Sequence, residues 1–139
     1  MAFVDVEVHV RLKLFALWSS VMFFYIYNDY FQLWQPGHLQ AMLAGQLFFP
    51  GSPQWVLLGG SSVMIVPSLM PFLALVLPVR VNRWLNIIFG VVYSLIISAV
   101  LVAFKVGWYF YIMYSVIEVI LTMLIVWYAW SWPKEASNR

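Results

Sequence analysis

The sequence predicts an all-α membrane protein, a bundle of four transmembrane helices. Of its 139 residues, 65% are hydrophobic and only 9% are charged, whereas a soluble domain has about 45–50% apolar and about 25% charged residues. Four apolar stretches are each long enough to cross a hydrocarbon core of about 30 Å. Only helices suit them, because lipid cannot satisfy the open edges of strands. We therefore expect one integral membrane domain over residues 1–139.

The four expected spans cover residues 12–34, 54–77, 84–104 and 108–132. Basic residues set their orientation, since Lys and Arg concentrate on the cytoplasmic side of a membrane. Both termini are therefore expected in the cytoplasm. Only Lys105 lies on the opposite side, and the end that carries the termini holds the other basic residues, Arg11, Lys13, Arg80, Arg83, Lys134 and Arg139.

Residues 4–13 alternate strictly between apolar and polar side chains. This period is typical of a half-buried strand, which would pair with a second copy or a partner. The segment also suits an amphiphilic arm lying on the lipid headgroups, and we favour the arm.

The connection between the first two spans contains apolar residues at helical spacing, Leu39, Met42, Leu43 and Leu47. They predict a short interfacial helix over residues 38–48. This helix would either cover the outer mouth of the bundle as a lid or, as we favour, fill the outer interface.

The second span contains Pro67 and Pro71 and is followed by Pro78. Each proline lacks an N–H and frees the carbonyl four residues earlier. Neighbouring helices, serines or water must satisfy these carbonyls, and Ser68 is well placed to do so. The span is either broken, with carbonyls lining a cavity, or kinked and packed, with residues 59–62 (Gly-Gly-Ser-Ser) allowing close approach.

Gly90, Ser94 and Ser98 form a stripe of small residues at four-residue intervals along the third span. Such a stripe is typical of close helix–helix contact, and we interpret it as a contact within the bundle. If the protein were an accessory subunit, the stripe would instead face a larger complex.

Asp29 and Glu118 are the only acidic residues inside the expected spans. A charged side chain at the bilayer centre costs roughly 2.5–3.5 kcal/mol to insert, so an acid there indicates function. We expect both acids to line one outward-facing cavity, with Glu118 protonated because desolvation favours the neutral form. Lys105 is the nearest base and is expected to reach Asp29. Alternatively, Glu118 donates to a proline-freed carbonyl and Asp29 is interfacial.

Two helical stripes converge on these acids, because residues at i, i+4, i+7 and i+11 share one helix face. The combination of aromatic side chains with a few polar groups is typical of a ligand site. The predicted ligand-binding residues are Asp29, Glu118, Tyr25, Asn28, Tyr111, Ser115, Thr122, Tyr93 and Trp18.

Signatures of catalysis are missing from the sequence. It has no cysteine, no histidine within a span, no nucleophile elbow and no phosphate-binding loop. We therefore expect no catalytic residue, no metal and no cofactor. The net charge of +2 is too small to indicate a nucleic-acid partner.

Four segments carry a resemblance to known proteins: residues 22–29 (MFFYIYND), 82–87 (NRWLNI), 117–119 (IEV) and 127–130 (WYAW). They resemble an uncharacterised family of short prokaryotic four-span membrane proteins, which implies the inner (plasma) membrane. More distantly, the layout is similar to the EXPERA superfamily of sterol isomerases and sigma-type receptors, with Asp29 and Pro71 at matching places. That similarity implies a sterol-like or amphiphilic amine ligand. The membrane histidine of the isomerase and the acid of its second helix are missing, so binding is implied rather than isomerisation.

Three functions follow as expectations. The first is intramembrane binding of a lipophilic, cationic or sterol-like small molecule by Asp29 and Glu118. The second is a small proton-coupled multidrug-type transporter acting as a homodimer. The third is an accessory subunit of a larger membrane complex. Membrane lipid is an expected partner in each case.

Overall fold

The computed structural model describes residues 6–45, 53–103 and 107–133, and this part of the chain is helical without strands. The long helices are α1 (Val10–Gln32), α3 (Pro53–Val76), α4 (Val79–Ala103) and α5 (Tyr109–Trp130), and a short helix, α2 (His38–Leu43), follows α1. Each long helix has the length and hydropathy needed to cross a membrane. The predicted fold class, an all-α four-span membrane protein, is confirmed.

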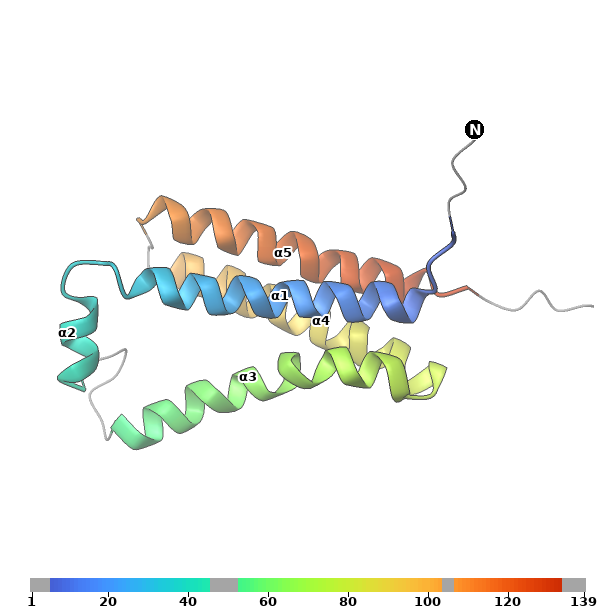
Figure 1. Ribbon diagram of the computed structural model, residues 1–139, viewed down its shortest axis with the longest axis horizontal. Coiled ribbons are helices and arrows are strands. Elements are labelled where there is room, and N and C mark those ends of the chain that lie inside the picture. The colour runs from blue at the N-terminus through green and yellow to red at the C-terminus, as the bar shows by residue number, and fades with distance from the viewer. Residues whose placement is uncertain (1–5, 46–52, 104–106, 134–139) are drawn as a thin grey trace, which may run out of the picture.

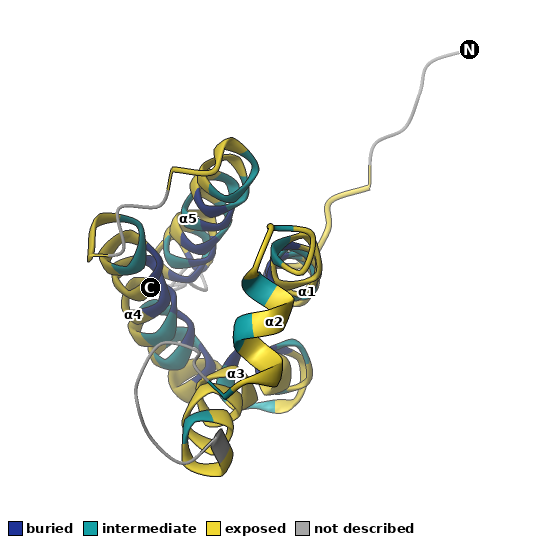
Figure 2. Cartoon of the chain, turned by 90° about the vertical axis from the view of Figure 1, so that its left-hand side faces the viewer, coloured by how far each residue is buried: buried dark blue, intermediate teal, exposed yellow. Residues whose placement is uncertain are grey.

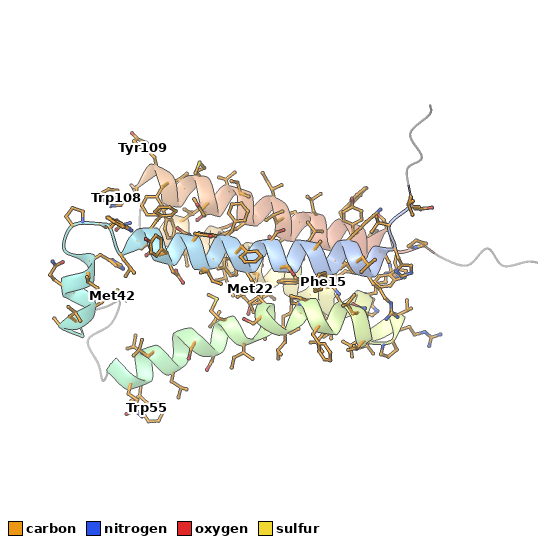
Figure 3. All side chains as sticks on the ribbon, in the orientation of Figure 1. Phe15, Met22, Met42, Trp55, Trp108 and Tyr109 are labelled. Carbon is orange, nitrogen blue, oxygen red and sulfur yellow. The ribbon has the colours of Figure 1, made fainter. Side chains whose placement is uncertain are left out.

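The helix α5 packs against both α1 and α4, and α1 also packs against α3 (Figure 1). The contact between α3 and α4 is the smallest of the main helix contacts. The start of α1 and the end of α5 lie at one end of the bundle, called here the basic end because Arg11, Lys13 and Arg83 lie there. The opposite end, called the α2 end, also carries Trp55 and Trp108 (Figure 3), where indoles favour a membrane interface.

One apolar face of α1 forms the centre of the core. Its buried residues follow each other at spacings of three and four, as expected for a helix that packs along one side; they are Val10, Leu14, Trp18, Val21, Tyr25 and Asn28. The helix thus includes Val10 to Lys13, so the strand interpretation is wrong for these residues. Residues 6–9 are exposed and non-helical, and the first part of the alternating segment lies outside the described residues.

The stripe of small residues on α4 packs against α5 within the same chain. Gly90 approaches so closely that a Cβ there would lie 2.7 Å from the side chain of Val126 and 3.2 Å from the Thr122 carbonyl oxygen. The hydroxyl groups of Ser94 and Thr122 are 2.6 Å apart and share a hydrogen bond. The interpretation of the stripe as a surface for a larger complex is therefore wrong for Gly90 and Ser94, whereas Ser98 is exposed.

Side chains of α4 satisfy two of the carbonyls that prolines leave free in α3. The Tyr93 hydroxyl donates to the carbonyl of Val63, four residues before Pro67. The amide of Asn82 donates to the Ala74 carbonyl, four residues before Pro78, at 2.6 Å. Ser68 does not fill the role expected of it, because its hydroxyl donates at 2.6 Å to the carbonyl of Met64, whose helical partner is not a proline.

The first half of α3 diverges from α1 (Figure 1) and has no buried residue from residue 54 to residue 65. Figure 2 shows this part of the helix as largely exposed. A Cβ at Gly59 or Gly60 would meet nothing within 4 Å in the described structure. The interpretation of residues 59–62 as a close-packing patch within the bundle is therefore wrong. Pro67, which is fully buried, lies where the unpacked half of the helix meets the packed half.

A buried chain of hydrogen bonds joins α1, α4 and α3 toward the basic end. The Trp18 indole donates to Asn86 at 2.7 Å, and the Asn86 amide donates to the side chain of Asn82 at 2.7 Å. Asn82 in turn donates to the Ala74 carbonyl, as described above. Both asparagines lie near the start of α4, which begins at Val79, before the apolar span expected from residue 84.

Arginines at the basic end cap the C-termini of two helices. Arg11 donates to the carbonyl of Leu75 in the last turn of α3 at 2.7 Å. The guanidinium of Arg83 donates to the carbonyl of Ala129 at 3.2 Å and lies 5.6 Å from the centre of the Trp130 ring. A cation near the last carbonyls of a helix is favourable because it opposes the negative end of the helix dipole.

The short helix α2 lies across the α2 end, between α1 and α3 (Figures 1 and 2). It covers His38–Leu43, has no buried residue, and begins after Gly37, whose φ of 81° suits glycine. The expected interfacial helix extended to residue 48, and its last three residues lie outside the described part of the chain.

Candidate functional site

All four long helices contribute to one cavity in the half of the bundle nearer the α2 end. Its volume is about 110 Å³. This is smaller than the roughly 300–1,000 Å³ of a pocket that encloses a drug-sized ligand, but it has room for a polar head group. The lining residues are Tyr25, Asn28, Asp29, Val63, Met64, Tyr93, Ile96, Ile97, Val100, Tyr111 and Glu118.

Three buried polar atoms on this cavity have no hydrogen-bond partner among the described residues. They are the Tyr25 hydroxyl, the Asn28 Oδ1 and the Glu118 Oε1. The side chains of Tyr25, Asn28 and Glu118 are only 8%, 5% and 2% exposed. A buried polar group left unpaired costs about 1–3 kcal/mol. Three residues that line one cavity thus each carry a buried polar atom whose desolvation no bond in the described structure offsets.

The helices α1 and α5 position these groups by their register. Tyr25 and Asn28 lie at the end of the buried stripe of α1, and Glu118 lies in the middle of the buried stripe of α5. Glu118 lies nine residues after the start of α5 at Tyr109, roughly 14 Å along the helix. The carboxyl group therefore lies well inside the apolar span, where charge is expensive.

Asp29 occupies the exposed rim of the same cavity. Its Oδ1 accepts a long hydrogen bond of 3.4 Å from the side-chain amide of Gln32. Both acids of the expected site thus line one cavity, with Glu118 inside and Asp29 at the edge. Lys105, which was expected to reach Asp29, lies outside the described residues.

The wall opposite the acids is apolar and reaches the lipid-facing surface. Val63 and Met64 of α3 and Ile96 of α4 line the cavity while remaining 41%, 37% and 40% exposed. They lie where α3 diverges and its contact with α4 is small. The polar lining thus comes mainly from α1 and α5, and the apolar lining from α3 and α4 includes side chains that are exposed at the surface.

The structure brings six of the nine predicted ligand-binding residues to the cavity, namely Asp29, Glu118, Tyr25, Asn28, Tyr111 and Tyr93. Trp18, Thr122 and Ser115 are not among the lining residues. Trp18 donates to Asn86 and packs edge-on against Tyr93, with ring centres 6.2 Å apart. Thr122 bonds Ser94, and Ser115 is 1% exposed within the helix packing. These three side chains instead form hydrogen bonds or pack between helices of the bundle.

Sequence reasoning missed the apolar wall. Ile97 and Val100 lie four and seven residues after Tyr93, so they share its helix face, a signal that the sequence contained. Val63 is the residue whose carbonyl Pro67 frees, which is a second signal. No sequence signal identifies Met64 and Ile96 as lining residues, because apolar residues occur on every side of a membrane helix.

The structural alternative for Glu118 is not supported. In that alternative its carboxyl would donate to a carbonyl freed by a proline of α3. Tyr93 and Asn82 occupy the carbonyls freed by Pro67 and Pro78, and the Oε1 of Glu118 has no partner in the described structure. Within that same part of the chain, the acidic and histidine side chains form no group of three that could hold a metal ion.

Fold and site together define a small integral membrane protein with a buried carboxyl group on a cavity lined by all four long helices. The chain belongs to the family of unknown function DUF6326, whose model matches residues 1–138. The resemblance to an uncharacterised family is thereby confirmed at the level of the family. No curated protein and no solved structure matches the chain, so the similarity to the EXPERA superfamily has no support.

Proposed function

We propose that this protein binds the polar head of a lipophilic, cationic small molecule within the membrane. The observation that carries the proposal is the set of three unpaired buried polar atoms, from Tyr25, Asn28 and Glu118, around one cavity. Asp29 adds a second carboxyl group at the rim.

The charges favour a cation over an anion or a neutral head. Two acids line the cavity, and none of the described residues that line it is basic. Charges interact more strongly at low dielectric than in water, so an ionised Glu118 would bind a cation tightly and repel an anion. A buried charge without a partner is costly, and a cationic ligand would remove that cost.

The position of the cavity favours a lipophilic body attached to that head. A space of about 110 Å³ cannot enclose a whole sterol-sized molecule. The exposed apolar side chains of Val63, Met64 and Ile96 lead from the cavity to the lipid-facing surface. An alkyl or sterol-like body would therefore lie between α3 and α4 while the head reaches the acids.

We also propose that the basic end faces the cytoplasm of a prokaryotic inner membrane. Arg11, Lys13, Arg80 and Arg83 lie near this end, as the positive-inside rule expects of a cytoplasmic face. The cavity would then belong to the outer half of the membrane.

The test uses the purified full chain in lipid nanodiscs containing hexadecylamine, its N,N-dimethyl or N,N,N-trimethyl form, hexadecanol, or hexadecanoic acid at equal mole fraction. Binding to the folded state raises the unfolding temperature. At least one cationic amphiphile is expected to stabilise the protein, and the alcohol and the acid are not. The proposal fails if no cation stabilises it more than hexadecanol does.

A second candidate is a proton-coupled transporter that acts as a homodimer. It is favoured by the unpaired carboxyl oxygen of Glu118 and by the first half of α3, which has no buried residue from residue 54 to residue 65. Uptake of a cationic dye into proteoliposomes, abolished by collapse of the proton gradient, would support it. The third candidate, an accessory subunit, predicts instead a stoichiometric partner on purification and no response to amphiphiles.

A further inference from the structure

We infer that the cavity selects a primary ammonium group on a single alkyl chain. This inference rests on the proposed function and narrows its ligand class. It is drawn from the number and chemistry of the unpaired atoms, from the size of the cavity, and from the direction in which the cavity opens.

All three unpaired atoms can accept a hydrogen bond from a ligand. The amide oxygen of Asn28 can only accept, as can an ionised carboxylate oxygen of Glu118, and the phenol oxygen of Tyr25 can accept as well. A primary ammonium presents three N–H donors on one nitrogen. One head group of this kind can therefore satisfy all three atoms at once and also neutralise the carboxylate.

Other head groups leave some of these three oxygen atoms without a hydrogen-bond donor. A tertiary ammonium brings one N–H and a quaternary ammonium brings none, so two or three buried oxygens stay without donors. An alcohol brings one donor and no charge. Each oxygen left unpaired is expected to cost roughly ten-fold in affinity. A cavity of about 110 Å³ also disfavours the added methyl groups.

The competing mode is a cage of aromatic faces, which recognises quaternary ammonium through cation–π contacts. Tyr25, Tyr93 and Tyr111 do line the cavity. However, Tyr93 is held by two contacts, since its hydroxyl donates to the Val63 carbonyl and its ring packs against Trp18. The Tyr93 ring is therefore held in place and cannot rearrange around a ligand to complete a cage, so we favour recognition by the oxygen atoms.

A single chain is indicated by the apolar wall. Val63, Met64 and Ile96 lie together at the exposed side, where α3 and α4 make little contact. One alkyl chain can leave along this seam and lie among the acyl chains of the membrane. The ligand would thus reach the site from the bilayer, not from water.

The test compares the cations with one another in the same nanodiscs. Hexadecylamine is expected to raise the unfolding temperature most, with an apparent affinity about ten-fold or more above that of hexadecyltrimethylammonium. Native mass spectrometry should show one retained hexadecylamine per chain. Equal or stronger stabilisation by the trimethyl form would overturn the inference and favour the aromatic cage, while the proposed function would survive. No stabilisation by any cation would remove both.

A matched pair of variants tests whether each unpaired oxygen atom contributes a hydrogen bond to the ligand. Tyr25→Phe removes one unpaired oxygen and should lower the affinity for hexadecylamine about ten-fold without changing that for the trimethyl form. Tyr27→Phe removes a hydroxyl from the same helix at an exposed position, 53% accessible and outside the cavity, and should change neither. An equal loss for both ligands in Tyr25→Phe would contradict recognition by hydrogen bonding.

Discussion

The hydroxyl group of Tyr93 donates to the backbone carbonyl of Val63, which Pro67 deprives of its helical partner. One contact thus joins α4 to the kink of α3 and holds a residue of the cavity wall in place. Tyr93→Phe should lower the free energy of unfolding by about 1–3 kcal/mol, because the carbonyl becomes unpaired. Thermal or denaturant unfolding in a defined detergent measures this change.

The control for this prediction restores the missing donor. In a Pro67→Ala chain the N–H of residue 67 can bond Val63 again, so Tyr93→Phe should cost much less there. A double-mutant cycle isolates the coupling between the two positions. Equal costs in both backgrounds would mean that the hydroxyl does not serve the carbonyl.

Two buried asparagines should respond differently to the same substitution. Asn82→Leu leaves the Ala74 carbonyl without its donor, which should cost about 1–3 kcal/mol of stability, whereas the Asn86 amide keeps its hydrogen bond to the Asn82 backbone carbonyl. Asn28→Leu removes an oxygen that has no partner in the described structure, together with an amide group that interacts with Glu118, so it should cost less stability than Asn82→Leu. Unfolding of both variants under one condition checks the contrast.

Gly90→Ala should weaken the seam between α4 and α5. The new Cβ would lie 2.7 Å from the Val126 side chain, which is stiff because it is β-branched, and 3.2 Å from a backbone oxygen. Overpacking of this kind costs about 1–3 kcal/mol. Val126→Ala in the same chain should recover part of the loss. Gly59→Ala is the matched control, since a Cβ there meets nothing within 4 Å, and it should be neutral or stabilising.

Glu118→Gln should preserve the fold and abolish the response to cations. The amide has nearly the shape of the carboxyl but no charge, and a hydrogen bond to a charged group contributes about 1.5–3 kcal/mol, so hexadecylamine affinity should fall about ten- to a hundred-fold. Glu7→Gln, an exposed change outside the helices, should have no effect. Undiminished stabilisation of Glu118→Gln by hexadecylamine would exclude the carboxyl from the site.

The orientation can be tested with single cysteines, because the natural chain has none. Gln35→Cys lies after α1, near the α2 end, and Ser131→Cys lies just after α5 at the basic end. A membrane-impermeant thiol reagent added to intact cells should label the first and spare the second until the membrane is opened. The reverse pattern would place the basic end outside.

Hydropathy was sufficient to predict the four-span architecture, because a helix that crosses lipid needs a long apolar stretch whatever its partners. Helical periodicity on two spans also placed Tyr25, Asp29, Tyr111 and Glu118 together. The same reasoning misplaced Trp18 and Thr122. Periodicity tells which side of a helix is buried, but it does not reveal which polar atoms find partners in the same chain.

The proline-rich span shows this limit most clearly. The sequence indicated that carbonyls would be freed, yet the donors come from Tyr93 and Asn82 on a helix whose pairing with α3 the sequence does not reveal. The packing of α3 against α4 determines that Tyr93 and Asn82, and not Ser68, donate to the freed carbonyls. For the same reason, the exposed state of Gly59 and Gly60 became evident only from the path of α3.

Arg11 and Arg83 bond the last carbonyls of α3 and α5, so residues that bear on the orientation of the protein in the membrane also stabilise its fold. Under the proposed orientation, the guanidinium groups that mark this end as cytoplasmic also bond the last carbonyls of two neighbouring spans. Attempts to invert this protein by exchanging those arginines for neutral residues would consequently fray the bundle as well as redirect it.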